Sequence, residues 1–390
     1  MTKSSKIPRR ILLGPGPSDV HDRVLRAMSR PVIGHLDPEF LQIMDQTQGM
    51  LREAFATTNP VTFPISGTGS AGMEAAIVNM VEPGDRVVVG VAGFFAQRLA
   101  EQAERNGAEV VRVEADWGTS IDPERIAAAI QEGDTKIVAL VHVETSTGVL
   151  QQLYDVVQAA HAAGAMVIVD AVASLGGHPV DVDARGIDVC YSGSQKCLSA
   201  PPGLAPITFS EAAVARVKQR RTPVRSWYLD VSLLTKYWGG DRTYHHTAPI
   251  SSVYALHEAL RIVNAEGADE RAARHRRHHQ ALVTGLEAMG LKMVVEDPQR
   301  RAWTLNAVRV PDGVDDAEVR SFLLRRHGIE IAGGLGPLAG KIWRIGLMGE
   351  SATRNNVLLL LGALELAMKL QGYQHTPGAG VGAAVEAYAG

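Results

Sequence analysis

Short apolar segments alternate with helical patterns between residues 61 and 210, and this alternation constrains the fold more than any other feature of the sequence. Strand-length apolar runs lie at 61–66, 86–93, 109–115, 136–143, 166–171, 187–192 and 206–210. Helical patterns separate them at 70–82, 94–106, 123–131 and 153–163. Strands joined through helices pair in parallel, so we expect an α/β domain whose mainly parallel sheet is covered by helices on both faces. Ligands of such sheets bind beyond the carboxyl ends of the strands.

The pattern changes after the long helical stretch 251–290. Strands are predicted at 292–296, 305–310, 329–332 and 343–347, and helices at 316–327 and 352–370, which indicates a small α+β unit. We therefore expect a large domain over 1–265, with an N-terminal segment 1–25, and a small C-terminal domain over 266–390. The Gly- and Ala-rich tail after Gln371 is expected to fray.

Composition excludes several classes of function. A hydrophobic content of 46% with 21% charged residues is ordinary for a globular protein, and a net charge of −3 does not suggest nucleic acid binding. No apolar run is long enough for a membrane span or a signal peptide. Cys190 and Cys197 are too few for a disulfide framework and fit a reducing, cytoplasmic setting. The adjacent histidines His245 and His246 have poor spacing for metal ligation, so no metal is expected.

Lys196 is the leading candidate for chemistry. It follows a predicted buried strand, in the loop Tyr191-Ser-Gly-Ser-Gln-Lys196, and the stop Pro201-Pro-Gly203 comes after it. A lysine beside apolar packing loses hydration of its ammonium group unless the amine reacts. The reaction that suits it is a Schiff base with an aldehyde cofactor. The competing interpretation is a lysine in a surface loop.

Asp170 closes the apolar run 166–171, and a buried carboxylate needs a positive partner. A protonated pyridine nitrogen is such a partner, worth about 5 kcal/mol at ~3 Å for an effective dielectric near 20. Asp170 and Lys196 close successive predicted strands, so together they predict that one pyridoxal phosphate ring lies between them. Taken alone, Asp170 could equally be a turn or helix-capping acid.

The segment Ser66-Gly-Thr68-Gly69-Ser70-Ala-Gly72 joins a strand to a helix and predicts a phosphate site, since glycines free the amides of a helix start to meet an anion. It also matches the G-x-G-x-x-G fingerprint of dinucleotide-binding proteins. That fingerprint requires an acid at the end of the next strand, and the segment 86–93 ends without one. A nicotinamide dehydrogenase is therefore disfavoured.

Three further side chains follow predicted strands or lie within one. Phe95 could stack on a pyridine ring, and Thr145 could bond to a ring hydroxyl. Arg344, inside an apolar strand, needs an anion such as a substrate carboxylate, or an internal salt bridge. The Arg- and His-rich run 271–279 is interpreted as a solvated helix face.

With these motifs in place, the chain resembles the class V aminotransferases, which are pyridoxal 5′-phosphate enzymes of fold type I. Within this family it is most similar to the alanine–glyoxylate, or serine–pyruvate, type. The resemblance extends from residue 12 to about residue 349. The motifs that carry it lie at 12–18, 65–69, 146–151, 169–177, 191–196, 244–247 and 344–347.

The resemblance implies a role for each site residue. Lys196 would bind the cofactor aldehyde and carry the α-proton, and Asp170 would pair with the pyridine nitrogen. Phe95 replaces a frequent tryptophan as the stacking residue, and Thr145 replaces a frequent serine. The phosphate would be held by Thr68, Gly69, Ser70 and Gln195, together with Tyr244 and Thr247 of a neighbouring subunit, which implies a homodimer with a composite site. Arg344 would bind the substrate carboxylate, aided by Gly16 and Gly34.

The implied reaction is a ping-pong transfer of the amino group of alanine or serine to glyoxylate. The alternatives within the class are (S)-ureidoglycine of purine breakdown as the donor, or serine–glyoxylate or serine–pyruvate specificity. His35 and Tyr244 are interpreted as walls of the donor pocket that favour a small apolar or hydroxylated donor. A pyridoxal-dependent lyase or desulfurase is the alternative outside this class, but neither Cys190 nor Cys197 lies in a loop that suits a persulfide carrier. A non-catalytic binding protein leaves the lysine and acid unexplained.

Overall fold

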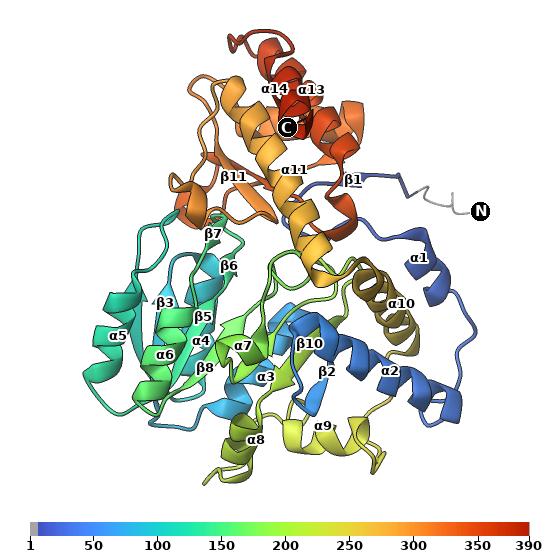
Figure 1. The fold of residues 1–390 in the computed structure, drawn as a ribbon, viewed down its shortest axis with the longest axis vertical. Helices are drawn as coiled ribbons and strands as arrows, with labels where there is room; N and C mark the ends of the chain where they lie inside the picture. Colours follow the sequence, from blue (N-terminus) through green and yellow to red (C-terminus); the bar gives the residue numbers. More distant parts are fainter. Residues whose placement is uncertain (1–6, 390) are drawn as a thin grey trace, which may run out of the picture.

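The computed structural model describes residues 7–389 and contains a large α/β part and a smaller C-terminal part (Figure 1). The central sheet has seven strands in the order β2-β10-β9-β8-β5-β3-β4. Only β10 runs against its neighbours, so the prediction of a mainly parallel sheet is confirmed. The strands span Val61–Ser66 (β2), Leu204–Phe209 (β10), Val189–Tyr191 (β9), Met166–Asp170 (β8), Thr135–Val141 (β5), Arg86–Val91 (β3) and Glu109–Glu114 (β4).

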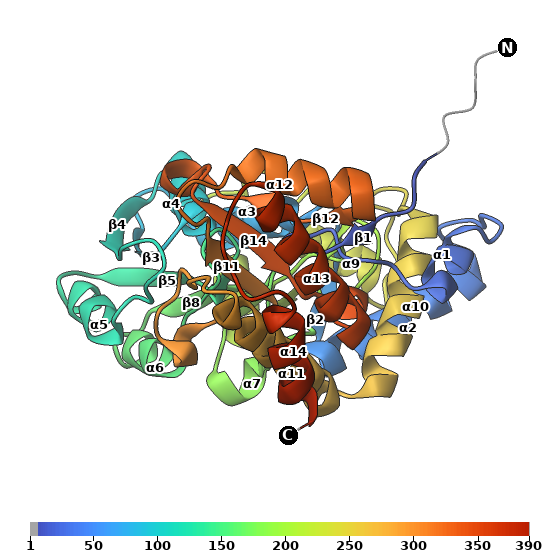
Figure 2. The same cartoon turned by 90° about the horizontal axis from the view of Figure 1, so that it is seen from above.

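Helices cover this sheet on both sides. Figure 2 shows α3 (Gly69–Met80) and α4 (Phe94–Arg105) on one side, and α5 (Pro123–Gln131) and α6 (Tyr154–Ala162) on the other. The sheet and these helices form the first hydrophobic core of the protein. Its strands are apolar because both of their faces are covered; Val87, Val88 and Val89 of β3, for example, are fully buried. The remaining helices of this part are α1 (Asp22–Met28), α2 (Pro38–Phe55), α7 (Val182–Arg185), α8 (Glu211–Lys218), α9 (Val231–Trp238) and α10 (Ile250–Glu266).

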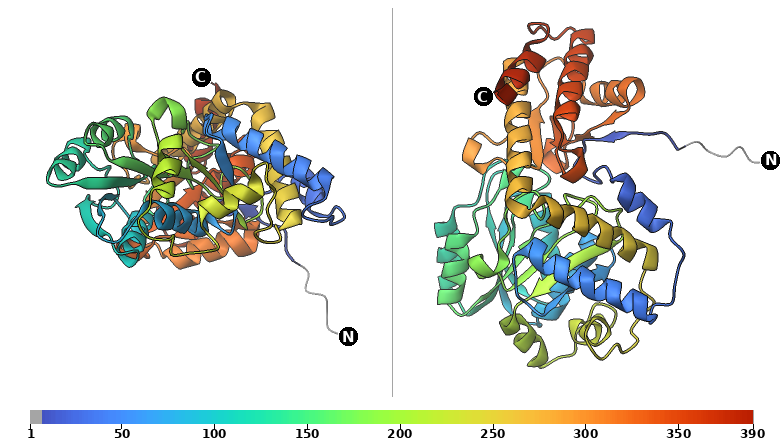
Figure 3. Two further views of the ribbon diagram at one scale, coloured as in Figure 1. Left: turned by 90° about the horizontal axis from the view of Figure 1, so that it is seen from below. Right: turned by 45° about the vertical axis from the view of Figure 1, so that its right-hand side comes forward.

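The smaller part has an antiparallel sheet of β11 (Leu305–Arg309), β14 (Ile342–Gly346) and β13 (Ala332–Gly333). Its helices are α11 (Ala268–Ala288), α12 (Asp316–Phe322), α13 (Arg354–Leu370) and α14 (Ala379–Ala389). A second hydrophobic core joins these elements, and Figure 3 shows this part beside the larger one. The prediction assigned residues 1–25 to the large domain. However, β1 (Ile11–Leu12) pairs with β12 (Ile329–Glu330), and Leu13 belongs to the second core.

Two predictions in this part were wrong. Residues 292–296 form no strand, because only one isolated bridge, Met293 to Val308, connects them to the sheet. The tail does not fray: it forms α14, in which Gly380 and Ala384 are buried. Small side chains allow this packing, since a Cβ on Gly380 would lie 2.3 Å from the Met289 sulfur.

The interpretation of residues 271–279 as a solvated helix face was also wrong for one side of α11. Arg271, His275, His278 and His279 are buried, and Arg271 is only 1% exposed. Polar partners make this burial possible: Arg271 donates to the carbonyls of Gly176 (2.8 Å) and Cys197 (2.6 Å) and pairs with Glu266. No helix within residues 7–389 is long and apolar enough to cross a bilayer.

Candidate active site

Lys196 and Asp170 line the same pocket beyond the carboxyl ends of the central strands. Asp170 is the last residue of β8 and lies opposite Tyr191, the last residue of the neighbouring β9. Lys196 follows β9 by five residues, in the loop that leads towards β10. The pocket lining contains eight of the predicted site residues: Thr68, Gly69, Ser70, Phe95, Thr145, Asp170, Gln195 and Lys196.

Asp170 is 3% exposed and is held by two hydrogen bonds. One oxygen accepts from the Val172 amide (2.8 Å) and the other from the Tyr191 hydroxyl (2.9 Å). Burial raises the pKa of Asp170 to about 6, against the lowering effect of these bonds, because a carboxylate in a dry site is poorly solvated. No salt bridge engages it within residues 7–389, so this carboxylate is available to a cationic ring.

Lys196 reaches the N-terminal segment, where its amine donates a hydrogen bond to the Pro15 carbonyl. Gly16 must be glycine here, since its φ is +102° and a Cβ would lie 2.5 Å from the lysine side chain. Burial, together with the smaller effect of the Arg344 charge, lowers the pKa of Lys196 to about 8, while Cys197 and Asp170 oppose the shift. The amine is therefore closer to neutral at physiological pH than an exposed lysine.

The start of α3 forms one wall of the pocket. Thr68 is its N-cap residue but makes no side-chain capping bond, and the first turn contains no acidic residue. The hydroxyls of Thr68 and Ser70 and the free amides of this turn are therefore available to bind an anion. Gln195 lies on the same pocket, and its buried side-chain oxygen has no partner in residues 7–389. A side-chain amide can offer either its oxygen or its NH2 group to a ligand.

Arg344 is buried at 6% exposure in β14 of the smaller part. Its Nε donates to the Gly333 carbonyl (2.8 Å) and its Nη1 to the Thr145 carbonyl (3.2 Å). Neither partner is an acid, so the internal salt bridge considered for this residue is absent from the described part of the chain. The remaining guanidinium donors can bind an anion that enters beside Thr145.

Six predicted residues lie outside the lining of this pocket: Gly16 and Arg344, described above, and Gly34, His35, Tyr244 and Thr247. His35 and Tyr244 contact each other, with ring centroids 5.3 Å apart. Tyr244 is 59% exposed, and Thr247 is exposed as well. Gly34, His35, Tyr244 and Thr247 are therefore not among the residues that surround Lys196 in the pocket of a single chain.

Several residues of the site escaped prediction from the sequence. The hydroxyl of Tyr191 and the amide of Val172 both bind Asp170, and Arg98 lies over the Phe95 ring (5.3 Å) and donates to Ser70 (3.3 Å). Glu144, 2% exposed, accepts hydrogen bonds behind the pocket. The sequence contained one signal that could have identified Glu144: it follows a predicted buried strand, and an acid in that position needs hydrogen-bond partners.

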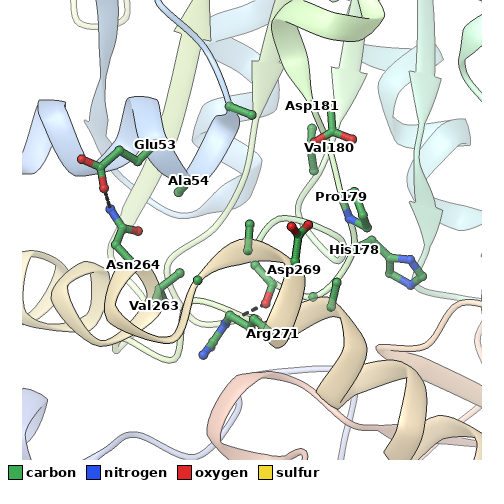
Figure 4. Close-up of a pocket in the computed structure, with 16 residues that line it drawn as sticks. Glu53, Ala54, His178, Pro179, Val180, Asp181, Val263, Asn264, Asp269 and Arg271 are labelled. Atoms are coloured by element: carbon green, nitrogen blue, oxygen red, sulfur yellow. Dashed lines mark hydrogen bonds between the residues drawn. The ribbon is translucent and has the colours of Figure 1, made fainter.

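A second pocket lies between the C-terminal end of α2, the α10–α11 turn and residues 176–181 (Figure 4). Arg271 lines it and bonds to the Gly176 carbonyl, while Asn264 bonds to Glu53. None of the predicted site residues lines this pocket.

Comparison with known proteins identifies the family. Residues 13–345 match the family model "Aminotransferase class-V". The (S)-ureidoglycine–glyoxylate transaminase of Bacillus subtilis is 44% identical over 97% of this chain and 94% of that protein. The alanine–glyoxylate aminotransferase of Callithrix jacchus is 42% identical over 97% of this chain and 91% of that protein. The chain therefore belongs to the class V aminotransferases.

Solved structures agree with this assignment. The ureidoglycine–glyoxylate aminotransferase from Bacillus subtilis superposes with a TM-score of 0.97 over 100% of both chains, at 44% identity. An alanine–glyoxylate aminotransferase from Nostoc sp. superposes with a TM-score of 0.92 at 47% identity, over 94% of this chain and 97% of that chain. The fold is that of the fold-type I aminotransferases, and the cofactor of this enzyme class is pyridoxal 5′-phosphate. The residues present fit that cofactor: a lysine amine, a buried carboxylate without a cation, an aromatic wall and an uncapped helix start share one pocket.

Proposed function

We propose that this aminotransferase moves the amino group of alanine or serine to glyoxylate in two half-reactions with ping-pong kinetics. The main support for the proposal is that Lys196 and Asp170 line the same pocket, at the start of α3. The acceptor follows from relatives that are named for glyoxylate and cover nearly the whole chain.

The cofactor would be held from all sides of this pocket. Asp170 would face its ring nitrogen, Phe95 its ring face, Thr145 its ring hydroxyl and Lys196 its aldehyde. The phosphate would meet Thr68, Gly69, Ser70 and Gln195. When bound, pyridoxal phosphate supplies an electron sink for the electron pair left as the substrate α-carbon loses its proton.

The chain's own residues perform the proton transfer and the orientation of the substrate. The low pKa of Lys196, caused mainly by burial, suits an amine that accepts the α-proton at Nζ and later returns it. Arg344 would bind the substrate carboxylate through donors that no acid occupies, aided by the backbone of Gly16 beside Lys196. This grip would orient the α-carbon towards Lys196 and exclude water from the carboxylate.

Lys196→Ala tests the proposal directly. We expect the variant to keep the fold but to lose transamination and the visible absorbance that bound pyridoxal phosphate gives the wild-type protein. Retained transamination would refute the role of Lys196. A colourless wild-type protein that binds a nicotinamide dinucleotide would refute the cofactor assignment.

(S)-Ureidoglycine is the second candidate for the donor, because a relative named for it is 44% identical. His35 and Tyr244 lie outside the Lys196 pocket of their own chain, so they would enter the donor pocket from the neighbouring subunit. There they would present two aromatic rings rather than side-chain amides, which favours a small donor over a ureido group. Comparing kcat/KM for alanine, serine and ureidoglycine with glyoxylate distinguishes the candidates. A preference for ureidoglycine would overturn the choice of donor while leaving the class intact. The desulfurase alternative lacks a carrier, because Cys190 and Cys197 are fully buried.

We also propose a homodimer with composite sites, in which the exposed Tyr244 and Thr247 reach the phosphate bound in the partner. Hybrid dimers of one Lys196→Ala chain and one Tyr244→Ala chain test this arrangement. If sites are composite, one of the two sites in each hybrid contains only wild-type residues and has full activity. If each chain builds its own site, no wild-type site exists in the hybrid.

The domain division and the location are likewise proposals. Two separate hydrophobic cores support a large domain over 1–265 and a small domain over 266–390, with residues 11–13 attached to the small one. Both cysteines are free, which suits the cytoplasm. Limited proteolysis and cell fractionation test these two assignments.

A further inference from the structure

Glu144 is a buried acid that the proposed reaction does not use. It is 2% exposed, and no lysine, arginine or histidine within residues 7–389 forms a salt bridge with it. Its carboxylate instead accepts from the Ser146 amide (3.0 Å) and hydroxyl (2.6 Å), and from the amides of Phe95 (3.4 Å) and Ala96 (3.1 Å). A carboxylate kept in such a place needs an explanation, because burial without a cation is costly.

These bonds make Glu144 the cap of α4. The N-cap residue of this helix is Gly93, which has no side chain to offer, and the first amide, that of Phe94, donates to the Ser146 hydroxyl (3.0 Å). Glycine is required there for space, since a Cβ would lie 2.4 Å from the Ser146 oxygen and 2.5 Å from Glu144. The loop acid and its serine therefore satisfy the free amides of α4, whose dipole favours a negative charge at this end.

The same loop connects two walls of the pocket. Phe95, on the first turn of α4, and Thr145, between the two capping residues, both line the pocket that contains Lys196. The Thr145 carbonyl accepts from Arg344 (3.2 Å), which places the proposed carboxylate-binding arginine one residue from the cap. One carboxylate thus lies next to both the start of the aromatic wall and the residue to which the arginine bonds.

We propose that Glu144 is a positioning residue that fixes the Phe95 ring and the Thr145–Arg344 contact relative to each other, so that cofactor and substrate carboxylate are held in register. This inference rests on the proposed function, because it assigns the cofactor to Phe95 and the substrate carboxylate to Arg344. Glu144 touches neither ligand directly.

Glu144→Gln removes the charge and two acceptor positions while keeping the shape of the side chain. Loss of hydrogen bonds to a charged group should weaken pyridoxal phosphate binding to the apo-protein by about tenfold or more. The visible circular dichroism of the bound cofactor should fall, because a loosened Phe95 holds the ring less asymmetrically. The KM for alanine should rise together with these changes, because Arg344 loses its anchor.

Glu82→Gln is the matched control. Glu82 is a carboxylate of 8% exposure that accepts from the amides of Arg221 and Thr222 (both 3.0 Å), and it does not line the pocket. We expect a comparable change in melting temperature in both variants, but altered cofactor affinity and dichroism only in Glu144→Gln. Unchanged affinity and dichroism, or equal losses in the control, would overturn the positioning role.

Ser146→Ala is a second variant that tests the positioning role of Glu144 if Glu144→Gln does not fold. It deletes only the hydroxyl that joins Phe94 to Glu144. Cofactor affinity and the visible circular dichroism should change in the same direction as in Glu144→Gln, with affinity lower by about threefold or more.

A double-mutant cycle with Phe95→Leu is a stricter test: Glu144→Gln should weaken cofactor binding much less in the Phe95→Leu background. Fully additive effects would show that Glu144 does not act through the ring. Cofactor binding and turnover of the wild-type protein test the proposed function separately. If the wild type binds the cofactor and turns over, and the Glu144 and Ser146 variants bind the cofactor as tightly, only the positioning role of Glu144 is refuted.

Discussion

Replacing Arg271 by methionine tests the structural explanation of the most unexpected cluster in the molecule. Arg271 is 1% exposed near the start of α11, where it bonds to the carbonyls of Gly176 and Cys197 and pairs with Glu266. The Cys197 carbonyl follows Lys196 directly, so this guanidinium holds the loop that carries the lysine. Methionine keeps most of the apolar stem and removes the charge.

The expected cost follows from the partners that remain. Both carbonyls lose a charged donor, whereas Glu266 keeps its pairing with Arg274. Each hydrogen bond from a charged donor is worth about 1.5–3 kcal/mol, so losing both costs about 3–6 kcal/mol. An unfolding entropy of about 2.1 cal/mol/K per residue gives about 0.8 kcal/mol/K for this chain, so the melting temperature should fall by about 4–7 °C.

Scanning calorimetry and circular dichroism melts of the two forms measure this loss. Arg277→Met is the matched control, since Arg277 lies on the exposed side of the same helix. The control should melt within about 1 °C of the wild type, because exposed substitutions usually change stability by about 0.5 kcal/mol or less. Equal melting temperatures for both variants would refute the argument that the buried guanidinium stabilises the lysine loop.

Three further outcomes are expected. Arg344→Ala should raise the KM of every amino acid by about 100-fold, because a charge-assisted pair of hydrogen bonds is worth about 3 kcal/mol, and an unchanged KM would remove its role. Asp170→Asn keeps the shape and an acceptor for Tyr191 but should lower kcat by about 10²–10³-fold through lost electrostatic stabilisation, while normal turnover would contradict that role. In cofactor-free protein, burial lowers the pKa of Lys196 to about 8 from 10.5, so its labelling by an amine-directed reagent should rise through pH 8 and level off above it. A midpoint near 10.5 would count against the buried position.

Much of the fold was predictable because local pattern and final environment coincide. The strand 61–66 and the helix 123–131 were predicted with the bounds that the structure has, since an apolar run and a Pro123 start mark them clearly. Lys196 and Asp170 were recognisable because polar groups at the ends of buried strands need partners. The errors lay where packing overrides local signals: residues 292–296 have a strand pattern but pair only once, and the Gly- and Ala-rich tail became α14.

By itself, the sequence determined the parallel sheet, the order of its elements and the residue types at the strand ends, because these depend on periodicity and on groups close in the chain. Only the tertiary structure decided that Tyr191 supports Asp170, that Glu144 caps α4 and that Arg271 is buried. Each of those contacts joins segments whose relative position depends on strand register and on helix packing. No local pattern encodes such distances, since a polar side chain has the same sequence signature whether its partner is water or a distant carbonyl.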